Sequence, residues 1–441
     1  MKRLCGVHAP HRKSTADSVP NRIPVPTEIV IPMSMHIGAP AKPTVTSGDQ
    51  VKVGQLIAEA AGIISAPIHS SVSGRVKELC DFVGAGGQVT TAIVIESDGE
   101  QAVYEDLVPP EVNDLQSFLD AICNSGVVGL GGAGFPTAAK LNVGDLSKIE
   151  YVIINGAECE PYITSDTRTM IDNTALVWDG VLLIREYLKV KNIIFGIENN
   201  KPQCVEKFEE LAKDIDGIYV KSLPAIYPQG GEKVLIYNLT GRMVPEDKLP
   251  IDVGTVVINC TTLASIARYI KTGMPLVEKC ITVDGSAVSN PQNVIAPIGT
   301  PIKNLFDFCG GVKIPGKVLY GGPMMGLAVP NTDVPVLKTT NAVLAFREKD
   351  SRQPKETGCI RCGRCIAHCP LKLLPAEIDN AYNLNYYNLL EFYKVNMCME
   401  CGCCAYVCPA KKPLVHTMKL SKAALRKYLE QKKAKEAKAN G

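Results

Sequence analysis

The chain has few aromatic residues, almost no net charge and no long apolar run. A single Trp and 6% aromatic residues give nucleic-acid bases little to stack on, and a formal net charge of +2 attracts few phosphates. No segment reaches the roughly 18 apolar residues that a membrane helix needs. The opening residues, MKRLCGVH, lack the apolar core and cleavage site of a signal peptide. We therefore expect no nucleic-acid binding, no direct membrane span and folding in the cytoplasm.

The length and the cysteine content point to several domains and to bound metal. A chain of 441 residues is too long for one core, and 46% hydrophobic with 21% charged residues is an ordinary globular balance. Seventeen cysteines is a high number for such a chain. In a reducing compartment, clustered cysteines favour metal ligation over disulfides.

Eight of the cysteines form two runs of the same spacing near the C-terminus. The first run is CIRCGRCIAHCP, from Cys359, and the second is CMECGCCAYVCP, from Cys398. Both follow C-x2-C-x2-C-x3-C-P, in which three thiolates bind one [4Fe–4S] cluster and the fourth binds the other cluster of the pair. One predicted ligand set is Cys359, Cys362, Cys365 and Cys408. The other set is Cys398, Cys401, Cys404 and Cys369, with Cys403 as an extra thiol inside the second run.

Structural zinc is the alternative for these runs, because paired C-x2-C motifs also bind zinc. A tetrahedral zinc ion takes four ligands, whereas the two runs supply eight, each fourth cysteine being followed by Pro. The pattern therefore favours two clusters, which pass electrons one at a time. The intervening segment 375–397 has a helical pattern, so we expect a mainly helical dicluster domain.

Three further regions precede the cysteines. Prolines and glycines between short apolar runs predict a small β sandwich or barrel over residues 20–110. From about residue 114, buried strands alternate with amphipathic helices, which predicts a mostly parallel sheet covered on both faces. Residues 275–345 return to short strands and tight turns. The fold class is therefore multidomain α/β.

Two loops of the α/β region have the composition of a ligand site. The stretch GLGGAGFPTAAK, residues 129–140, contains glycines that let backbone N–H groups approach a phosphate, and ends in a lysine. The acidic loop NGAECEP, residues 155–161, follows a predicted strand. Ligands bind at the carboxyl ends of parallel strands, so the pair predicts a cofactor site. Glu158 and Glu160 could instead be solvated loop carboxylates that merely cap the following segment.

These two loops resemble the flavin and acidic loops of the NADH-oxidising flavoprotein subunit of respiratory complex I. YPQGGEK, residues 227–233, and VINCTTL, residues 257–263, are similar to its glycine–glutamate and asparagine loops. With the opening GVHAPHRK and the dicluster runs, nearly the whole chain resembles the C subunits of Rnf complexes. The resemblance implies a barrel-sandwich hybrid at 1–112, a Rossmann-like FMN and NAD(H) domain at 113–272, a β-grasp module at 273–346, a ferredoxin domain at 347–420 and a charged helical tail at 421–441.

The resemblance also implies cofactors and partners. FMN would be bound without a covalent bond, NAD(H) would be the substrate, and the chain would lie at the cytoplasmic face of the cell membrane, peripheral to an ion-translocating ferredoxin:NAD+ oxidoreductase. Its partners would be other subunits, above all a ferredoxin-like cluster subunit. The implied cofactor residues are Gly129, Gly131, Gly132, Phe135, Lys140, Asn155, Glu158, Glu232, Asn259 and Thr262, of which Phe135 and Glu232 match positions facing the nicotinamide.

The chain departs from the complex I flavoprotein at three of these loops. It has Leu130 where that protein has Arg, Tyr162 where it has Gly, and Gly231 where it has a second glutamate. The N-terminal region also resembles the lipoyl and biotinyl fold, but its stretch IISAPIHS, residues 63–70, has no lysine to modify. We interpret it as a docking module.

Other functions remain open at this point. The chain could be a soluble flavin and iron–sulfur oxidoreductase with a small substrate of its own, or a scaffold in which the clusters are structural. A flavin favours the electron-transfer function, because it exchanges hydride with a nicotinamide and single electrons with clusters. Near the N-terminus, Cys5, His8 and His11 could be part of a metal site, and residues 11–13 could contact phosphate or a subunit, or form a solvated basic turn.

Overall fold

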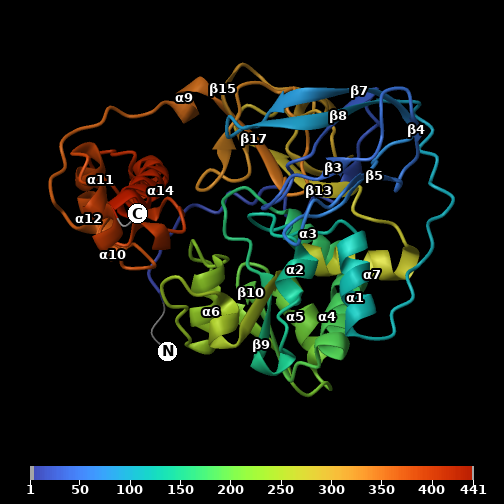
Figure 1. Ribbon diagram of the computed structural model, residues 1–441, viewed down its shortest axis with the longest axis horizontal. Helices are drawn as coiled ribbons and strands as arrows, with labels where there is room; N and C mark the ends of the chain where they lie inside the picture. The colour runs from blue at the N-terminus through green and yellow to red at the C-terminus, as the bar shows by residue number, and fades with distance from the viewer. Residues whose placement is uncertain (1–3, 440–441) are drawn as a thin grey trace. The chain divides into compact units, whose positions relative to one another are not determined.

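The computed structural model describes residues 4–439 and divides them into two compact units (Figure 1). The larger unit consists of His11–Leu223 and Pro250–Arg352. The smaller unit joins the chain up to Pro10 with Pro224–Leu249 and with the chain from Gln353 onward. Each unit has its own hydrophobic core.

A parallel four-stranded sheet is the centre of the α/β part of the larger unit. Its strand order is β11-β10-β9-β12, formed by Ile218–Leu223, Asn192–Glu198, Tyr151–Gly156 and Thr255–Asn259. The central strand β9 is a run of β-branched residues that are completely buried at Val152, Ile153 and Ile154, as expected for a strand covered on both faces. The helices of this part are α1 (Leu115–Asn124), α2 (Thr137–Leu141), α3 (Ser165–Asp172), α4 (Thr174–Leu188), α5 (Pro202–Ala212) and α7 (Cys260–Thr272), with short 3-10 turns at Leu146–Lys148 and Pro250–Val253.

The N-terminal part of the larger unit is a pair of small antiparallel sheets, as predicted. One sheet has the order β2-β8-β7-β4, from Glu28–Pro32, Val89–Ser97, Gly74–Val83 and Gln50–Val51. The other has the order β3-β5-β6, from Lys42–Pro43, Leu56–Glu59 and Ile68–His69. Ile29, Ile31 and Ile95 are fully buried and belong to the same core as the parallel sheet.

A six-stranded mixed sheet completes the larger unit. Its order is β1-β14-β13-β17-β15-β16, from Asn21–Arg22, Gln292–Pro297, Glu278–Asp284, Ala342–Arg347, Pro315–Tyr320 and Leu327–Ala328. The helix α8 (Ile302–Phe308) contributes Ile302, Leu305 and Phe306 to a separate core with this sheet. A short helix, α9 (Glu348–Ser351), follows β17. This architecture agrees with the predicted compact β-rich module.

The smaller unit is helical, as the helical pattern of the segment 375–397 predicts. Its helices are α6 (Glu232–Thr240), α10 (Arg364–Ala367), α11 (Pro375–Asn383), α12 (Tyr387–Phe392), α13 (Cys403–Tyr406) and α14 (Leu414–Ala439), with a 3-10 turn at Val395–Met397. The two runs have the same backbone course, because Arg361, Gly363 and Lys372 are left-handed in the first run and Glu400, Gly402 and Lys411 in the second.

The C-terminal helix differs from its prediction. We expected a solvated helix from about residue 421, but α14 already begins at Leu414, and Met418, Ser421 and Leu425 on it are buried. The apolar members, Met418 and Leu425, are seven positions apart, so they share one face of the helix that packs into the core of the smaller unit. Within residues 4–439, no helix is both long and apolar enough to cross a bilayer.

Candidate flavin and iron–sulfur sites

The predicted flavin residues of the larger unit meet at the carboxyl edge of the parallel sheet. Asn155 lies near the end of β9 and Asn259 ends β12, and the two are register partners on neighbouring strands. The strand β10 lies on the other side of β9, so the chain order reverses between β9 and β12. Open parallel sheets bind their ligands at such a point.

The glycine-rich loop is closed on itself and fastened to α7. Gly129 N donates to Phe135 O at 2.9 Å, and Leu130 N donates to Thr262 Oγ1 at 3.0 Å. The loop also lies against Asn259, because a Cβ built on Gly131 would be 2.3 Å from Asn259 Nδ2. The Thr262 hydroxyl therefore positions the glycine-rich loop by accepting this hydrogen bond from Leu130 N. The residue type of Thr262 alone did not indicate this contact.

The same loop leaves room for a ligand. A Cβ built on Gly132 would meet no atom within 4 Å, and the residues at 131–133 are exposed. Lys140 is half-buried on the following helix α2. Exposed backbone N–H groups beside a lysine match the chemistry of a flavin phosphate, so the residues present fit FMN.

Asn259 links the loop to an acidic residue. Its Oδ1 accepts from Thr261 N at 2.9 Å and Thr262 N at 3.2 Å, which caps α7. Its Nδ2 donates to Asp166 at 2.8 Å, and Thr261 Oγ1 donates to the same carboxylate at 2.6 Å. Asp166 lies in the first turn of α3 and is buried. It is a site residue that sequence reasoning missed.

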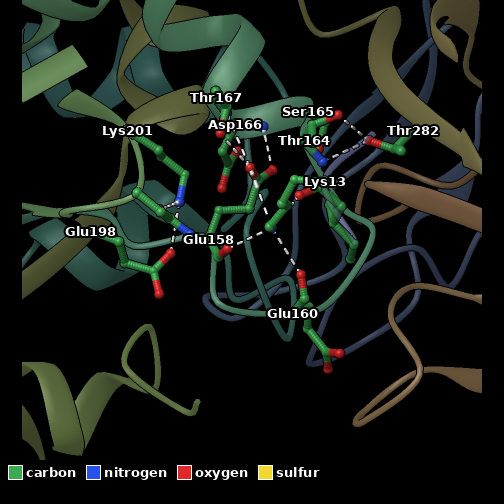
Figure 2. A network of polar contacts seen from close by, with 12 residues as sticks. Lys13, Glu158, Glu160, Thr164, Ser165, Asp166, Thr167, Glu198, Lys201 and Thr282 are labelled. Carbon is green, nitrogen blue, oxygen red and sulfur yellow. Dashed lines mark hydrogen bonds and ion pairs between the residues drawn. The ribbon is translucent and has the colours of Figure 1, made fainter. Parts of the chain in front are cut away.

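Glu158 is a buried structural carboxylate rather than a solvated one. It accepts from Asp166 N at 2.7 Å, and from Thr167 N at 3.3 Å and Thr167 Oγ1 at 2.6 Å, at the N-terminus of α3 (Figure 2). Its residue exposure is 6%, and this burial raises the pKa of Glu158. Glu158 is therefore not solvated, but it does cap the following segment α3, as the alternative interpretation held. A direct contact between Glu158 and a flavin stays a prediction.

Glu160 joins the acidic loop to the loop before β16. Its carboxylate accepts from the backbone N–H groups of Met324 at 3.1 Å and Met325 at 2.8 Å. Burial raises the pKa of Glu160 to about 7, against the opposing effect of these two donors. This carboxylate therefore changes charge near neutral pH.

Two lysines outside the predicted set of cofactor residues stabilise this edge (Figure 2). Lys201 Nζ is 2.7 Å from Glu198, which ends β10, and both side chains are at least 96% buried. Burial lowers the pKa of Lys201, but the charges of Glu198 and Glu158 outweigh it and raise that pKa overall. Lys13 donates from its Nζ to backbone oxygens of the acidic loop. It is therefore not part of a solvated basic turn.

Four of the eight predicted cluster ligands surround one recess in the smaller unit. Its wall includes Cys369 from the first run together with Cys398, Cys401 and Cys404 from the second, with Cys403 beside them. This grouping is the crossed set predicted from the spacing, and it collects the four thiols that one cluster takes. Within residues 4–439, no three His, Cys, Asp or Glu side chains converge closely enough to hold a single metal ion.

The surroundings of this recess also fit a cluster. Backbone N–H groups of Leu373 and Glu400 donate to the sulfurs of Cys369 and Cys398, both at 3.4 Å. Such bonds to ligand sulfurs are among the factors that set cluster potentials. Burial raises the pKa of Cys398 to about 11, so this thiol keeps its proton until iron displaces it.

The other predicted ligand set lies nearer the surface. Cys359 and Cys362 are exposed, while Cys365 and Cys408 are half-buried. Cys359 is close enough to influence the charge of Cys365. The full ligand assignment of this cluster stays a prediction. The difference in burial between the two sets could not be inferred from two runs of identical spacing.

Glu232 begins α6 and belongs to the smaller unit, whereas the other predicted flavin residues belong to the larger one. The loop before Glu232 packs against the second cysteine run. Tyr227 Oη donates to the carbonyl oxygen of Cys401 at 2.7 Å, and a Cβ on Gly231 would lie 2.2 Å from Met399 Cε. The predicted nicotinamide loop is thus fastened directly to a predicted ligand of the buried cluster. In the same unit, Cys5 accepts from Lys372.

Comparison with known protein families matches four parts of the chain. Residues 122–268 match the Nuo51 FMN-binding domain, and residues 2–100 match the RnfC barrel sandwich hybrid domain. Residues 280–328 match the SLBB domain, and residues 352–409 match the 4Fe-4S dicluster domain. The predicted cofactors, FMN and two [4Fe–4S] clusters, are therefore confirmed at the level of domains.

A solved structure shares the fold. The chain aligns with a chain of an NAD+-reducing [NiFe]-hydrogenase in the H2-reduced state, with a TM-score of 0.53 and 18% identity. The alignment covers 71% of this chain and 63% of that one, so it spans less than two thirds of the hydrogenase chain. At this identity the likeness concerns the fold alone.

Sequence relatives extend over nearly the whole chain. The C subunit of the proton-translocating ferredoxin:NAD(+) oxidoreductase complex of Clostridium ljungdahlii is 41% identical, over 98% of this chain and 95% of the relative. The C subunit of the Na(+)-translocating complex of Acetobacterium woodii is 39% identical, over 95% of each chain. The C subunit of the ion-translocating oxidoreductase complex of Rhodobacter capsulatus is 38% identical, over 85% and 73%. The chain therefore belongs to the family of C subunits of ion-translocating ferredoxin:NAD(+) oxidoreductase complexes.

Proposed function

We propose that this chain exchanges electrons between NAD(H) and the other subunits of a membrane-bound, ion-translocating ferredoxin:NAD+ oxidoreductase. The observation that carries the proposal is the presence of an FMN-binding domain and a dicluster domain in one chain. Relatives of nearly equal length are named as subunits of such complexes. The chain would be peripheral, at the cytoplasmic face of the membrane.

The residues at the sheet edge would bind and orient the flavin. The glycines at 129, 131 and 132 would present backbone N–H groups to its phosphate, with Lys140 as the neutralising cation. Asn155, Asn259 and Thr262 would hold the surrounding loops, and Phe135 and Glu232 would face the nicotinamide. Bound FMN supplies the exchange between hydride and single electrons that neither NAD(H) nor a cluster performs alone.

The smaller unit supports an order for the two clusters. The loop 227–233, predicted to face the nicotinamide, is hydrogen-bonded to Cys401 of the buried cluster site. The other site, around Cys359 and Cys362, is exposed. We therefore propose that the buried cluster exchanges electrons with the flavin and that the exposed cluster exchanges them with a partner.

The surface beside the exposed cluster supports a protein partner. Ile360 is 69% exposed, Arg361 beside it is exposed, and Arg364 is exposed at the start of α10. An apolar residue flanked by two guanidinium groups suits a partner surface with complementary carboxylates. We propose a ferredoxin-like cluster subunit of the complex as this partner.

Anaerobic titration of the full chain, loaded with clusters and FMN, tests the proposal. NADH should bleach the flavin absorbance, and NADPH at the same concentration should not. A protein that binds FMN but is not bleached by NADH would contradict the nicotinamide assignment. Bleaching that leads to turnover of a small substrate without any partner subunit would instead favour a soluble oxidoreductase.

A further inference from the structure

Lys13 is a nearly buried cation whose donors all point at one loop. Its side chain is 13% exposed, although the neighbouring Arg12 is exposed. Its Nζ donates to the carbonyl oxygens of Glu158 at 2.7 Å and Glu160 at 2.9 Å, and also to that of Ile163. An ammonium group has three donors, and all three bond to carbonyl oxygens within residues 158–163, two of them in the acidic loop. Figure 2 shows the Lys13 side chain inside the curve of this loop.

The segment that carries Lys13 is itself held in place. Tyr162 N donates to His11 O at 2.9 Å, and the hydroxyls of Thr15 and Thr164 lie 2.6 Å apart. Asn293 Nδ2 donates to the carbonyl oxygen of Thr15 at 2.8 Å. Lys13 is therefore fixed on both sides along the chain. Its ammonium is presented to the acidic loop by a rigid support, and is not free to bind a phosphate or another subunit.

The acidic loop transmits this contact toward the flavin loop. The Glu158 carboxylate is 3.9 Å from Lys13 Nζ and accepts from the first turn of α3. Asp166 in that turn accepts from Asn259. Asn259 caps α7, whose Thr262 accepts from Leu130 N in the glycine-rich loop. A continuous series of hydrogen bonds thus runs from the N-terminal segment to the predicted phosphate-binding loop.

We propose that Lys13 is a positioning residue of the flavin site, which holds the acidic loop in its binding shape and balances the carboxylates beside the cofactor. This inference rests on the proposed function, because it takes the glycine-rich and acidic loops as the FMN site. Lys13 touches neither FMN nor NAD(H) in this account and acts through Glu158. The Lys13 ammonium takes the place of the water molecules that the backbone carbonyls of Glu158 and Glu160 would bind if the loop were exposed.

The test compares Lys13→Met with Arg12→Met in the full, cluster-loaded chain freed of FMN. Both variants lose one positive charge from the same segment, but Arg12 is exposed. Lys13→Met should bind FMN at least about tenfold more weakly, because a lost charge-assisted hydrogen bond typically weakens an equilibrium by that factor or more. The midpoint potential of the bound FMN should also fall, since the remaining carboxylates disfavour added electrons. Arg12→Met should match the wild type in both measurements.

A second variant, Glu158→Gln, tests the proposal even if Lys13→Met does not fold. Glu158→Gln breaks the same series of hydrogen bonds one step later, so it should also weaken FMN binding. Its effect on the midpoint potential should be opposite, because a negative charge has been removed rather than a positive one. A residue that only stabilised the fold would not produce potential shifts of opposite sign in these two variants.

The outcomes separate this inference from the proposed function. Unchanged FMN affinity and potential in Lys13→Met, or a fall in melting temperature alone, would overturn the inference. FMN titration and dye-mediated reduction require no NADH. A wild-type protein that binds FMN but does not react with NADH would therefore contradict the nicotinamide function and still allow Lys13 to be judged.

Discussion

Replacing Gly131 with alanine should destabilise the flavin-free protein, whereas the same replacement at Gly132 should not. A Cβ at Gly131 would lie 2.3 Å from Asn259 Nδ2 and 2.7 Å from Asn259 Cγ. These are impossible contacts for non-bonded atoms, so the Asn259 side chain must leave its position. A Cβ at Gly132 would meet nothing within 4 Å. Neither glycine has a positive φ angle, so backbone strain is the same in both comparisons.

The magnitude follows from the bonds that Asn259 makes. Loss of an N-cap side chain costs about 1 kcal/mol. Loss of the charge-assisted hydrogen bond from Asn259 to Asp166 costs about 1.5–3 kcal/mol more. Gly131→Ala should therefore lower the free energy of unfolding of the larger unit by about 2.5–4 kcal/mol. Gly132→Ala should change it by no more than about 0.5 kcal/mol.

Thermal denaturation of the flavin-free variants measures this difference in stability, and FMN titration measures how strongly each variant binds the flavin. We expect both variants to bind FMN more weakly, Gly131→Ala because its loop is displaced and Gly132→Ala because its methyl group occupies the ligand space. Only Gly131→Ala should melt at a lower temperature before FMN is added. Equal melting temperatures for Gly131→Ala and the wild type would refute the packing of the glycine-rich loop on Asn259.

Three further changes test other parts of the account. Burial raises the pKa of Glu160 from 4.5 to about 7, so its stabilising contribution is complete below the ordinary pKa and is lost as the pH rises to the folded pKa. The melting temperature of Glu160→Gln relative to wild type should therefore rise between roughly pH 4.5 and pH 7 and level off above that range, and a constant difference would contradict the buried state of this carboxylate. Cys369→Ser should remove about half of the iron and abolish NADH-driven reduction of the remaining cluster. Cys359→Ser should remove a similar amount of iron, but NADH should still reduce the cluster that remains. Iron analysis and electron paramagnetic resonance measure both effects, and the reverse result would invert the cluster order. Lys201→Met leaves the buried Glu198 carboxylate without a counter-charge, so it should lower the free energy of unfolding by about 3–5 kcal/mol in chemical denaturation. The control, Lys213→Met, removes an exposed lysine and should lower it by less than about 1 kcal/mol, so equal losses would contradict the buried ion pair.

The parts that could be predicted from the sequence depend on short-range patterns. The cysteine runs carry their chemistry in the spacing between residues, so Cys369 could be assigned to the recess around Cys398 and Cys401 before any coordinates. Likewise, buried runs such as 151–155 have the composition of central parallel strands, and the glycine-rich loop lies beside them. Periodicity and spacing were sufficient for these elements because each is defined by neighbours in the chain.

The parts that could not be predicted depend on partners far apart in the chain. Nothing next to Lys13 indicates that it will meet carbonyl groups about 150 residues later, and the donors to Glu160 come from a loop a similar distance away. The apolar face of α14 was hidden among many lysines and glutamates in the sequence. Tertiary packing decided these cases, and local composition favoured exposure in each of them.

NADH reduction of the clusters, with and without FMN, tests the central claim most directly. The full chain loaded with iron and sulfide is divided, and one half is also loaded with FMN. We predict that NADH produces the electron paramagnetic resonance signal of reduced [4Fe–4S] clusters in the FMN-loaded half alone, while dithionite produces it in both. Clusters that NADH reduces equally without FMN, or that stay oxidised while the flavin is bleached, would contradict a relay from NAD(H) through flavin to the cluster pair.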